Sequence, residues 1–368
     1  MKNKRLLAAL LTLPFIFAGC SKIASNTQET SASKATTAVQ TVSEIEYDSQ
    51  SAEKIDLSKQ NDPVEITSGG AYLLTGSTTD GMITVDAGED EVVLILKDAE
   101  IGNPDSSPIY IKSAGKVEIS LEGTITLTNG GSFGIIDGEE LDSVVYCKTD
   151  LILTGEGTLQ IVSPSGHAIV CKDNLVISGG TYNIEAGEDG INTNDSLTVT
   201  GGTFNVTSGD DAFHTDGVLT VDSGTFTITA AEGLEGTIVV INNGEITINA
   251  SDDGINAAHK DESLSPYIEI NGGTVDITMG QGDTDGIDSN GDIIINGGTI
   301  SINGQSSCDY DGTASFNGGT LIVNGQETNT IPNQLMGGNG GKGGMGGEPP
   351  QGQGGMPNGR PEGKGPRG

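Results

Sequence analysis

A repeat of about 22 residues limits what this chain can fold into more than any other feature of its sequence. The repeated phrase has one or two glycines, a threonine and a run in which apolar and polar residues alternate. Thr181, Thr203 and Thr225 occupy the same place in three copies and are 22 residues apart. Related copies begin at Asn243, Asn271, Asn296 and Asn317. A fixed period of this length is typical of a solenoid, in which each repeat stacks on the next.

Each repeat contains three short alternating stretches. One precedes the glycine phrase, as at Leu197 and Val199, one follows it, as at Phe204 and Val206, and the third centres on residues such as Phe213. Alternation indicates half-buried strands, and a coil of three such strands buries its inner face only by stacking on similar coils. The sequence therefore predicts an all-β, single-stranded right-handed parallel β-helix with three strands per coil and roughly a dozen coils.

The alternation also predicts which residues form the core. Tyr182, Phe204 and Phe226 fall on inward positions, so we interpret them as core residues rather than as a platform for sugar rings. Cys147 and Cys171 align in adjacent coils, either as buried thiols or as a disulfide between coils. The outward residues beside this core are mostly Thr and Asn. They either hydrogen-bond sugar hydroxyls or form a plain polar face.

Both ends of the chain differ from the repeats. Residues 1–19 have a basic start and a short apolar run, which is typical of a signal peptide, and they end at Cys20 in a sequence that is similar to a lipobox. We expect lipid on Cys20; the alternative is ordinary secretion with an incidental cysteine. A flexible Ser/Thr-rich tether over 20–54, the β-helix domain over 55–330 and a disordered Gly-rich tail over 331–368 are expected to follow.

The chain is strongly acidic, with 17 Lys and Arg residues, 51 Asp and Glu residues and a formal net charge of −34. Nucleic acid is excluded as a partner because its binding needs a cationic surface. So many carboxylates on a patterned chain indicate either solvation or bound cations. With the lipid on Cys20, the sequence predicts a monomer on the extracellular face of the cell membrane, of the Gram-positive type, that touches the membrane through its lipid only.

The acidic residues recur in register at the corner before the third strand and form two columns. The first column consists of Asp189, Asp211, Glu232, Asp253 and Asp285. The second column follows three residues later and consists of Asn192, His214, Glu235, Asn256 and Asp288. Because residues between the columns, such as Phe213, point into the core, we expect the second column to point outward.

Stacked carboxylates need an explanation. At about 5 Å they repel one another by roughly 1 kcal/mol per pair in water, and by more where the dielectric is lower. Ca²⁺ binds oxygen ligands at about 2.3–2.6 Å, so one ion fits between acids on adjacent coils. The columns therefore predict structural calcium, with His214 as a neighbour rather than a ligand. The alternative is a solvated acidic corner that only aids solubility.

Several phrases resemble those of a known family. They are Asp210–Asp216 (DDAFHTD), Gly69–Tyr72 (GGAY), Glu91–Asp98 (EVVLILKD) and Pro108–Lys112 (PIYIK). Over about residues 50–345 the chain resembles the bacterial carbohydrate-binding β-helix proteins first described in a cellulose-degrading clostridium, which share the pectate-lyase-like fold of polysaccharide lyases. The resemblance implies calcium between coils and binding of cellulose-like or acidic plant polysaccharides, without established lyase activity.

The resemblance also implies a set of metal ligands. They are Asp189, Asp210, Asp211, Asp216, Asp252, Asp253, Asp283 and Asp285. Glu232, Glu235 and Asp288 of the two columns complete the predicted calcium ligands. The chain departs from the family pattern at Ala212, which replaces a glycine, and at Glu232 and Glu235, where aspartate is usual.

The sequence assigns no catalytic residue. A lyase acting on uronate polymers needs Ca²⁺ and a base, and Lys148, Lys172 and Lys260 are the candidates, although we interpret them first as charge partners of acids. The possible glycan contacts are Asn192, His214, Asn256, Lys148 and Lys172. We predict a surface-displayed, calcium-stabilised protein that binds acidic (uronate-type) or cellulose-like polysaccharides. The alternatives are a calcium-dependent polysaccharide lyase and a non-catalytic structural spacer.

Overall fold

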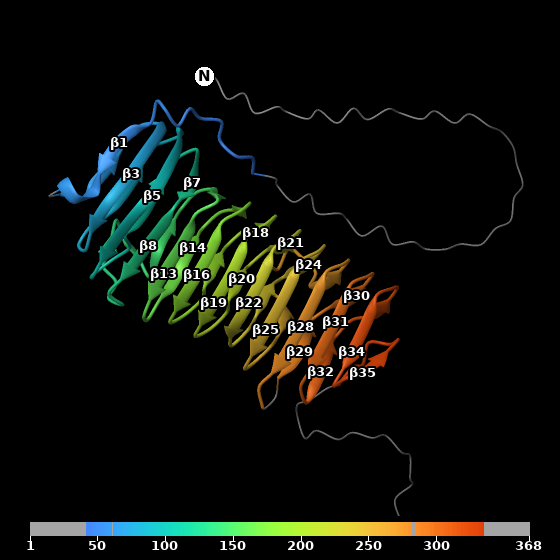
Figure 1. Ribbon diagram of the computed structural model, residues 1–368. Coiled ribbons are helices and arrows are strands. Elements are labelled where there is room, and N and C mark those ends of the chain that lie inside the picture. Colours follow the sequence, from blue (N-terminus) through green and yellow to red (C-terminus); the bar gives the residue numbers. More distant parts are fainter. Residues whose placement is uncertain (1–41, 61, 282–283, 335–368) are drawn as a thin grey trace, which may run out of the picture. The chain divides into compact units, whose positions relative to one another are not determined.

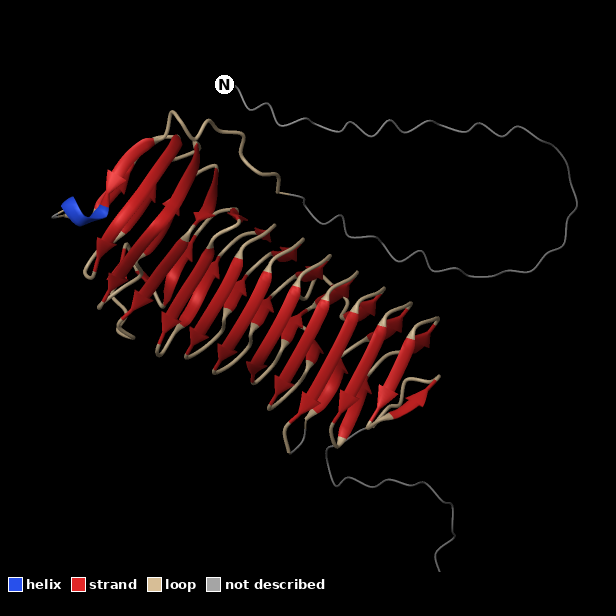
Figure 2. Ribbon diagram, viewed as in Figure 1, coloured by secondary structure: helices blue, strands red, loops and turns tan. Residues whose placement is uncertain are grey.

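The computed structural model describes residues 42–60, 62–281 and 284–334. Residues 1–19, Cys20, most of the expected tether and the tail from residue 335 lie outside this part. In the described part, short strands follow one another along one axis in the order of the sequence (Figures 1 and 2). Each coil contributes strands to three parallel stacks, which we call sheets 1, 2 and 3.

The bounds of the strands show how regular the stacks are. Sheet 1 contains β2 (Val64–Ile66), β4 (Ile83–Asp86), β6 (Ile109–Ser113), β11 (Ser143–Cys147), β14 (His167–Cys171), β17 (Ile191–Thr193), β20 (Phe213–Thr215), β23 (Leu234–Gly236), β26 (Ile255–Ala257), β29 (Asp285–Ser289) and β32 (Ser306–Tyr310). Sheet 2 contains β7 (Lys116–Glu122), β12 (Leu151–Gly155), β15 (Leu175–Ile177), β18 (Ser196–Val199), β21 (Val218–Val221), β24 (Ile238–Ile241), β27 (Tyr267–Ile270), β30 (Asp292–Ile295) and β33 (Ala314–Phe316). Sheet 3 contains β8 (Thr124–Asn129), β13 (Thr158–Ser163), β16 (Thr181–Ala186), β19 (Thr203–Ser208), β22 (Thr225–Ala230), β25 (Glu245–Ala250), β28 (Thr274–Met279), β31 (Thr299–Asn303) and β34 (Thr320–Val323).

In the first coils, one long strand takes the place of two short ones. β3 (Gly70–Thr78) and β5 (Glu91–Asn103) run through both sheet 2 and sheet 3, and β1 (Glu53–Asp56) pairs with β3 ahead of the 3-10 turn η1 (Leu57–Lys59). Within the described residues, sheet 1 has 11 strands, one for each coil, and β1 precedes them. The prediction of a parallel β-helix with three strands per coil and roughly a dozen coils is confirmed.

The register of the strands explains the sequence period. Thr181 pairs with Thr203 and Thr203 pairs with Thr225, so one repeat is one coil. The side chains that follow these threonines stack inside the helix. The ring centroids of Tyr182 and Phe204 are 4.9 Å apart and those of Phe204 and Phe226 are 4.8 Å apart, with nearly parallel planes. All three rings are buried, so the prediction that they belong to the core is confirmed.

Glycine is required at the corner before sheet 3. Gly224 has a φ of 131°, which side-chain-bearing residues rarely adopt. A Cβ atom at this position would also lie 2.9 Å from the Phe226 ring. The repeated glycine therefore lets the chain turn closely over the aromatic stack.

Some segments outside the repeat also have defined contacts. The backbone N–H of Ile45, within the expected tether, donates to Glu118 Oε2 at 2.8 Å. At the other end, β35 (Gln326–Thr328) folds back antiparallel on β34. Gln334, within the expected tail, donates its backbone N–H to the carbonyl of Cys308 at 2.9 Å, and its side-chain oxygen accepts from the N–H of Ser307 at 2.8 Å.

The cysteines are part of the interior. Cys147 and Cys171 are register partners in sheet 1, and both thiols are free and buried, as is Cys308. The interpretation of Cys147 and Cys171 as buried thiols is therefore confirmed over the disulfide alternative. Within the described residues, no helix has the length and apolar character needed to cross a bilayer.

Candidate functional site

The first acidic column lies where the chain enters sheet 1. Each of its carboxylates stands two residues before the central apolar residue of its strand. The N–H of Asp211 donates to Asp189 Oδ1 at 3.0 Å, and the N–H of Asp285 donates to Asp253 Oδ1 at 2.9 Å. The carboxylates therefore reach along the helix axis to the backbone of the next coil. Asp189 and Asp211 are buried, so this part of the column is not a solvated edge.

The second column faces the first one. Its members, from Asn192 to Asp288, are register partners on the outer side of sheet 1. Asn192 Nδ2 donates to Asp189 Oδ2 at 2.7 Å, and Asn256 Nδ2 donates to Glu232 Oε2 at 3.0 Å. The predicted outward direction is therefore correct, but the polar atoms are turned toward the acids of the first column rather than away from the protein.

The two columns come together most closely in one acidic cluster. Carboxylate oxygens of Asp211, Glu232 and Glu235 all lie within 4.8 Å of one another. His214 Nδ1 is 2.9 Å from Asp211 Oδ2 and 2.5 Å from Glu235 Oε2. Lys260 Nζ is 2.9 Å from Glu235 Oε1. Two cationic side chains therefore face three carboxylates in a largely buried space.

Burial sets the protonation of the cluster. Burial raises the pKa of Asp211 to about 7. The pKa of Glu232 rises further, to about 8, because repulsion from Glu235 and Asp211 adds to the effect of burial. Burial also acts to raise the pKa of Glu235, but hydrogen bonds with His214, Asp211 and Lys260 outweigh it and hold the pKa at about 2. Burial acts to lower the pKa of His214, but Asp211 and Glu235 raise it to about 10.

The donor atoms of the cluster fit a hard cation. Asp211, Glu232 and Glu235 supply only oxygen, which is what Ca²⁺ and Mg²⁺ bind. The amide oxygen of Asn256 is buried beside them and has no hydrogen-bond partner within the described residues. A buried acceptor without a donor is costly, and a cation would remove that cost. Asp189, Asp211 and His214 form a second group, in which the ring nitrogen suits a transition metal better. The buried acidic groups could thus hold a metal ion.

The same pKa shifts predict how stability depends on pH in EDTA. The folded-state pKa values are about 7 to 8 for Asp211, Glu232 and Asp253. The stabilising effect of these protonated carboxyl groups is therefore complete below their ordinary pKa of about 4, and it is lost as the pH rises through the folded-state values. Protonated His214 also stabilises the folded state, and this contribution is lost as the pH rises from its ordinary pKa of about 6.5 through its folded-state pKa of about 10. Glu235 is ionised throughout this range.

We therefore expect the free energy of unfolding in EDTA to be lower at about pH 8 than at about pH 5. Urea unfolding at the two pH values measures this difference. The matched series contains excess CaCl₂, where the difference should shrink because a metal binds the ionised ligands. A protein in EDTA that becomes more stable with rising pH would contradict the buried, protonated carboxylates.

The other predicted metal ligands are less enclosed. Asp210 and Asp252 are exposed, and Asp216 Oδ1 is 3.4 Å from His214 Nε2 at the far end of β20. Asp285 accepts a hydrogen bond from Ser306, and the pKa of Asp288 is raised to about 6 by burial and by Asp285. Asp283 and Cys20 lie outside the described residues.

The sequence did not indicate two contacts of the acidic columns, one made by His167 and one made by Lys260. His167 occupies the position of the first column one coil before Asp189, and its Nδ1 lies 3.2 Å from Asp189 Oδ2. Aligning Ile169 with Ile191, which pair in sheet 1, would have placed His167 there. Lys260 was interpreted as a charge partner of an acid or as a base, and its partner Glu235 was not predicted. It belongs to a longer turn after β26, and sequence spacing gives no sign that it reaches Glu235.

Comparison with known proteins identifies the family. The family model of carbohydrate-binding domain-containing proteins matches residues 60–233 and 213–331, which together are most of the chain. The chain belongs to this carbohydrate-binding family. A carbohydrate-binding domain-containing protein of Acetivibrio thermocellus is 32% identical over 148 residues, which are 39% of this chain and 52% of that protein. The chain thus spans about half the length of this curated relative.

A solved structure is also similar to this chain. It is described as a polysaccharide lyase-like protein from C. thermocellum, in a gadolinium derivative. The two share 27% sequence identity over 73% of this chain and 95% of the solved one, with a TM-score of 0.42.

The lysines proposed as bases or glycan contacts do not act together in this member of the family. Lys148 and Lys172 follow the strands of sheet 1, whereas the first acidic column precedes these strands, so the expectation that these lysines lie near the acidic corner is wrong. Lys148 Nζ pairs with Glu139 Oε1 at 2.9 Å, and Lys172 Nζ lies 5.6 Å from the centroid of the Tyr146 ring. Contact with Glu235 raises the pKa of Lys260 despite its partial burial, so Lys260 is a poor base.

A hairpin covers the outer side of sheet 1 near these lysines. It consists of β9 (Ile135–Ile136) and β10 (Glu139–Glu140), which interrupt the repeat between β8 and β11. Tyr110, Tyr146 and Val170 form a small apolar cluster under it together with Leu141. In this carbohydrate-binding family member, the hairpin therefore occupies a face on which two aromatic side chains point away from the main core.

Proposed function

We propose that this protein is a surface-displayed, calcium-stabilised binder of acidic (uronate-type) or cellulose-like polysaccharide. The observation that carries the carbohydrate ligand is the family match over residues 60–331. The long outward faces of the β-helix support it, because they present a repeated set of polar side chains to a repeated polymer. In sheet 3 alone, register partners such as Thr203 and Thr225, or Asn183 and Asn205, lie on successive coils about 4.8 Å apart.

Calcium is the metal that we propose for the acidic cluster. Its preference for several oxygen ligands in flexible geometry suits Asp211, Glu232 and Glu235, with the unpaired amide oxygen of Asn256 beside them. When bound, the ion supplies positive charge that offsets repulsion between acids of adjacent coils. The residues of the chain align the coils themselves, through the backbone hydrogen bonds that Asp189 and Asp253 accept.

Glycan binding can be tested with a small panel. The folded chain is incubated with insoluble cellulose and with immobilised polygalacturonate, in CaCl₂ and in EDTA, and the bound fraction is measured. We expect the protein to be retained on at least one of the two polymers in CaCl₂. In EDTA, we expect only the fraction of the protein that stays folded to be retained. Failure to bind either polymer in CaCl₂, with the fold verified by circular dichroism, would contradict this proposal, and failure on every acidic and neutral polymer would leave the structural-spacer interpretation.

We also propose that lipid on Cys20 holds the protein on the extracellular face of the membrane. The support is the sequence around Cys20, which resembles a lipobox after a signal-peptide-like segment. Metabolic labelling with a fatty-acid probe should mark the wild-type chain. The variant Cys20→Ala should lose the label and leave the membrane fraction. Label that persists in this variant would exclude lipid attachment at Cys20.

A further inference from the structure

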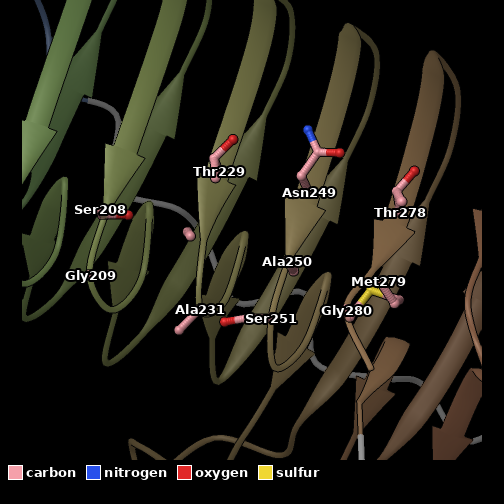
Figure 3. A pocket seen from close by; sticks show the side chains of 11 residues that line it. Ser208, Gly209, Thr229, Ala231, Asn249, Ala250, Ser251, Thr278, Met279 and Gly280 are labelled. Atoms are coloured by element: carbon pink, nitrogen blue, oxygen red, sulfur yellow. The ribbon is translucent and has the colours of Figure 1, made fainter. Parts of the chain in front are cut away.

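The outer face of sheet 3 has a hollow that is distinct from the acidic cluster. Its volume is about 480 Å³, a size that is ordinary for a ligand site. Figure 3 shows it over the ends of β22, β25 and β28, where Thr229, Asn249 and Thr278 stand on successive strands. Ala250 and Met279, which are register partners, give the hollow an apolar floor.

The polar side chains of this hollow have hydrogen-bonding capacity to spare. Thr229, Asn249 and Thr278 are exposed, and their side chains make no hydrogen bond within the described part of the chain. They occupy one register position, since Thr229 pairs with Asn249 and Asn249 pairs with Thr278. An incoming ligand therefore meets a donor or acceptor on each of three adjacent coils, at a spacing of about 4.8 Å.

A second hollow continues the first along the same face. Its volume is about 420 Å³, and Thr229 lines both hollows. Asn183, Asn205 and Thr227 line the second hollow, and Asn205 Nδ2 donates to Asn183 Oδ1 at 2.9 Å. The two hollows together reach from β13 to β28, which is far more than a single sugar needs and suits a polymer lying along the coils.

The charges on this face select against an acidic ligand. Among the residues that line the two hollows, Glu185 is the only one with a charged side chain, and none is Lys, Arg or His. The turns beside the floor continue directly into Asp210, Glu232 and Asp252. A uronate chain would find no cation to pair with and would be repelled by these acids. A neutral glycan chain carries no charge, so these acids do not repel it.

We propose that the two hollows form one groove for a single chain of a neutral, hydroxyl-rich glycan such as a β-glucan. This inference rests on the proposed polysaccharide binding and assigns its neutral ligand to sheet 3. Hydroxyl and amide groups of Thr229, Asn249 and Thr278 hydrogen-bond the sugar hydroxyls, and the C–H faces of the rings contact Ala250 and Met279. The acidic columns on sheet 1 take no part in this contact.

The experiment compares two isosteric double variants of the full chain. Thr229→Val/Thr278→Val removes two groove hydroxyls while keeping the shape of both side chains. Thr225→Val/Thr274→Val makes the same change on the same strands, β22 and β28, outside the groove. All four threonines are exposed, so the fold should be unaffected. Titration calorimetry with cellohexaose, in CaCl₂, measures the affinity.

We expect the groove variant to bind cellohexaose about tenfold more weakly than the wild type, and the control variant to bind it within about twofold. Equal affinities of the two variants would overturn the groove. A groove variant that loses oligogalacturonate affinity to the same extent would overturn the neutral selectivity. If the wild type binds oligogalacturonate but not cellohexaose, the groove is wrong while polysaccharide binding stands; if it binds neither, the proposed function itself fails.

Discussion

Transfer of the protein from CaCl₂ into EDTA is expected to lower its melting temperature by roughly 5–10 °C. An ion present at about a hundred times its Kd adds about 2.7 kcal/mol to the folded state. For a domain of this size, about 1 kcal/mol shifts the melting temperature by roughly 2–4 °C. The effect is expected to be this large because Asp211, Glu232 and Glu235 lie within 4.8 Å of one another in a buried space. Differential scanning calorimetry in the two buffers measures it.

Two double variants separate calcium from other effects of EDTA. Asp211→Asn/Glu232→Gln removes charge from the cluster and should abolish the difference between the buffers. Its melting temperature in EDTA should not fall below that of the wild type, because two repelling carboxylates are no longer buried. Glu185→Gln/Glu245→Gln changes two exposed acids of sheet 3 and should keep the full difference. Equal melting temperatures of the wild type in both buffers would contradict calcium binding at the acidic cluster.

Phe204→Ala is expected to be the most damaging single substitution, with a loss of about 3–5 kcal/mol in the free energy of unfolding. Phe204 is fully buried, stacks between Tyr182 and Phe226, and meets the edge of Phe213 at a centroid distance of 5.5 Å. Removing its ring leaves a cavity that fixed backbone on both sides cannot close. Urea unfolding, followed by far-ultraviolet circular dichroism, measures the loss.

The neighbouring residue provides the control for this prediction. Thr203 lies next to Phe204 on β19 but points outward and is exposed. Thr203→Ala should change the free energy of unfolding by no more than about 0.5 kcal/mol. If Phe204→Ala were as mild as Thr203→Ala, the aromatic column would not be a packed core.

The repeat made most of this fold predictable. In a solenoid, each column of the interior repeats in the sequence, so Tyr182, Phe204 and Phe226 could be assigned to the core by spacing alone. The same register predicted both acidic columns. What the spacing could not give was the direction of long side chains. Asn256 turns its amide into the cluster, and Lys260 reaches Glu235 from a turn of irregular length.

The departures from the repeat were also beyond prediction. The hairpin at Ile135–Glu140 has no counterpart in the other coils that the structure describes, so periodicity gives no information about it. Its position depends on contacts between residues that are far apart in the repeat pattern, such as the ion pair between Lys112 and Asp137 at 3.1 Å. Likewise, the expectation that Lys148 lies near the acidic corner failed because the two ends of a short strand are close in sequence but belong to different turns.

After β34 the chain folds back as the antiparallel strand β35, and this affects whether molecules associate end to end. The last coil of a parallel β-helix offers unpaired N–H and C=O groups to any other strand. Here β35 covers β34, and Gln334 hydrogen-bonds to Ser307 and Cys308 on β32. A chain cut before Gln326 would expose both strands, and light scattering should then report end-to-end filaments. We therefore expect these few residues of folded-back chain to limit end-to-end association in a protein built from similar stacked coils.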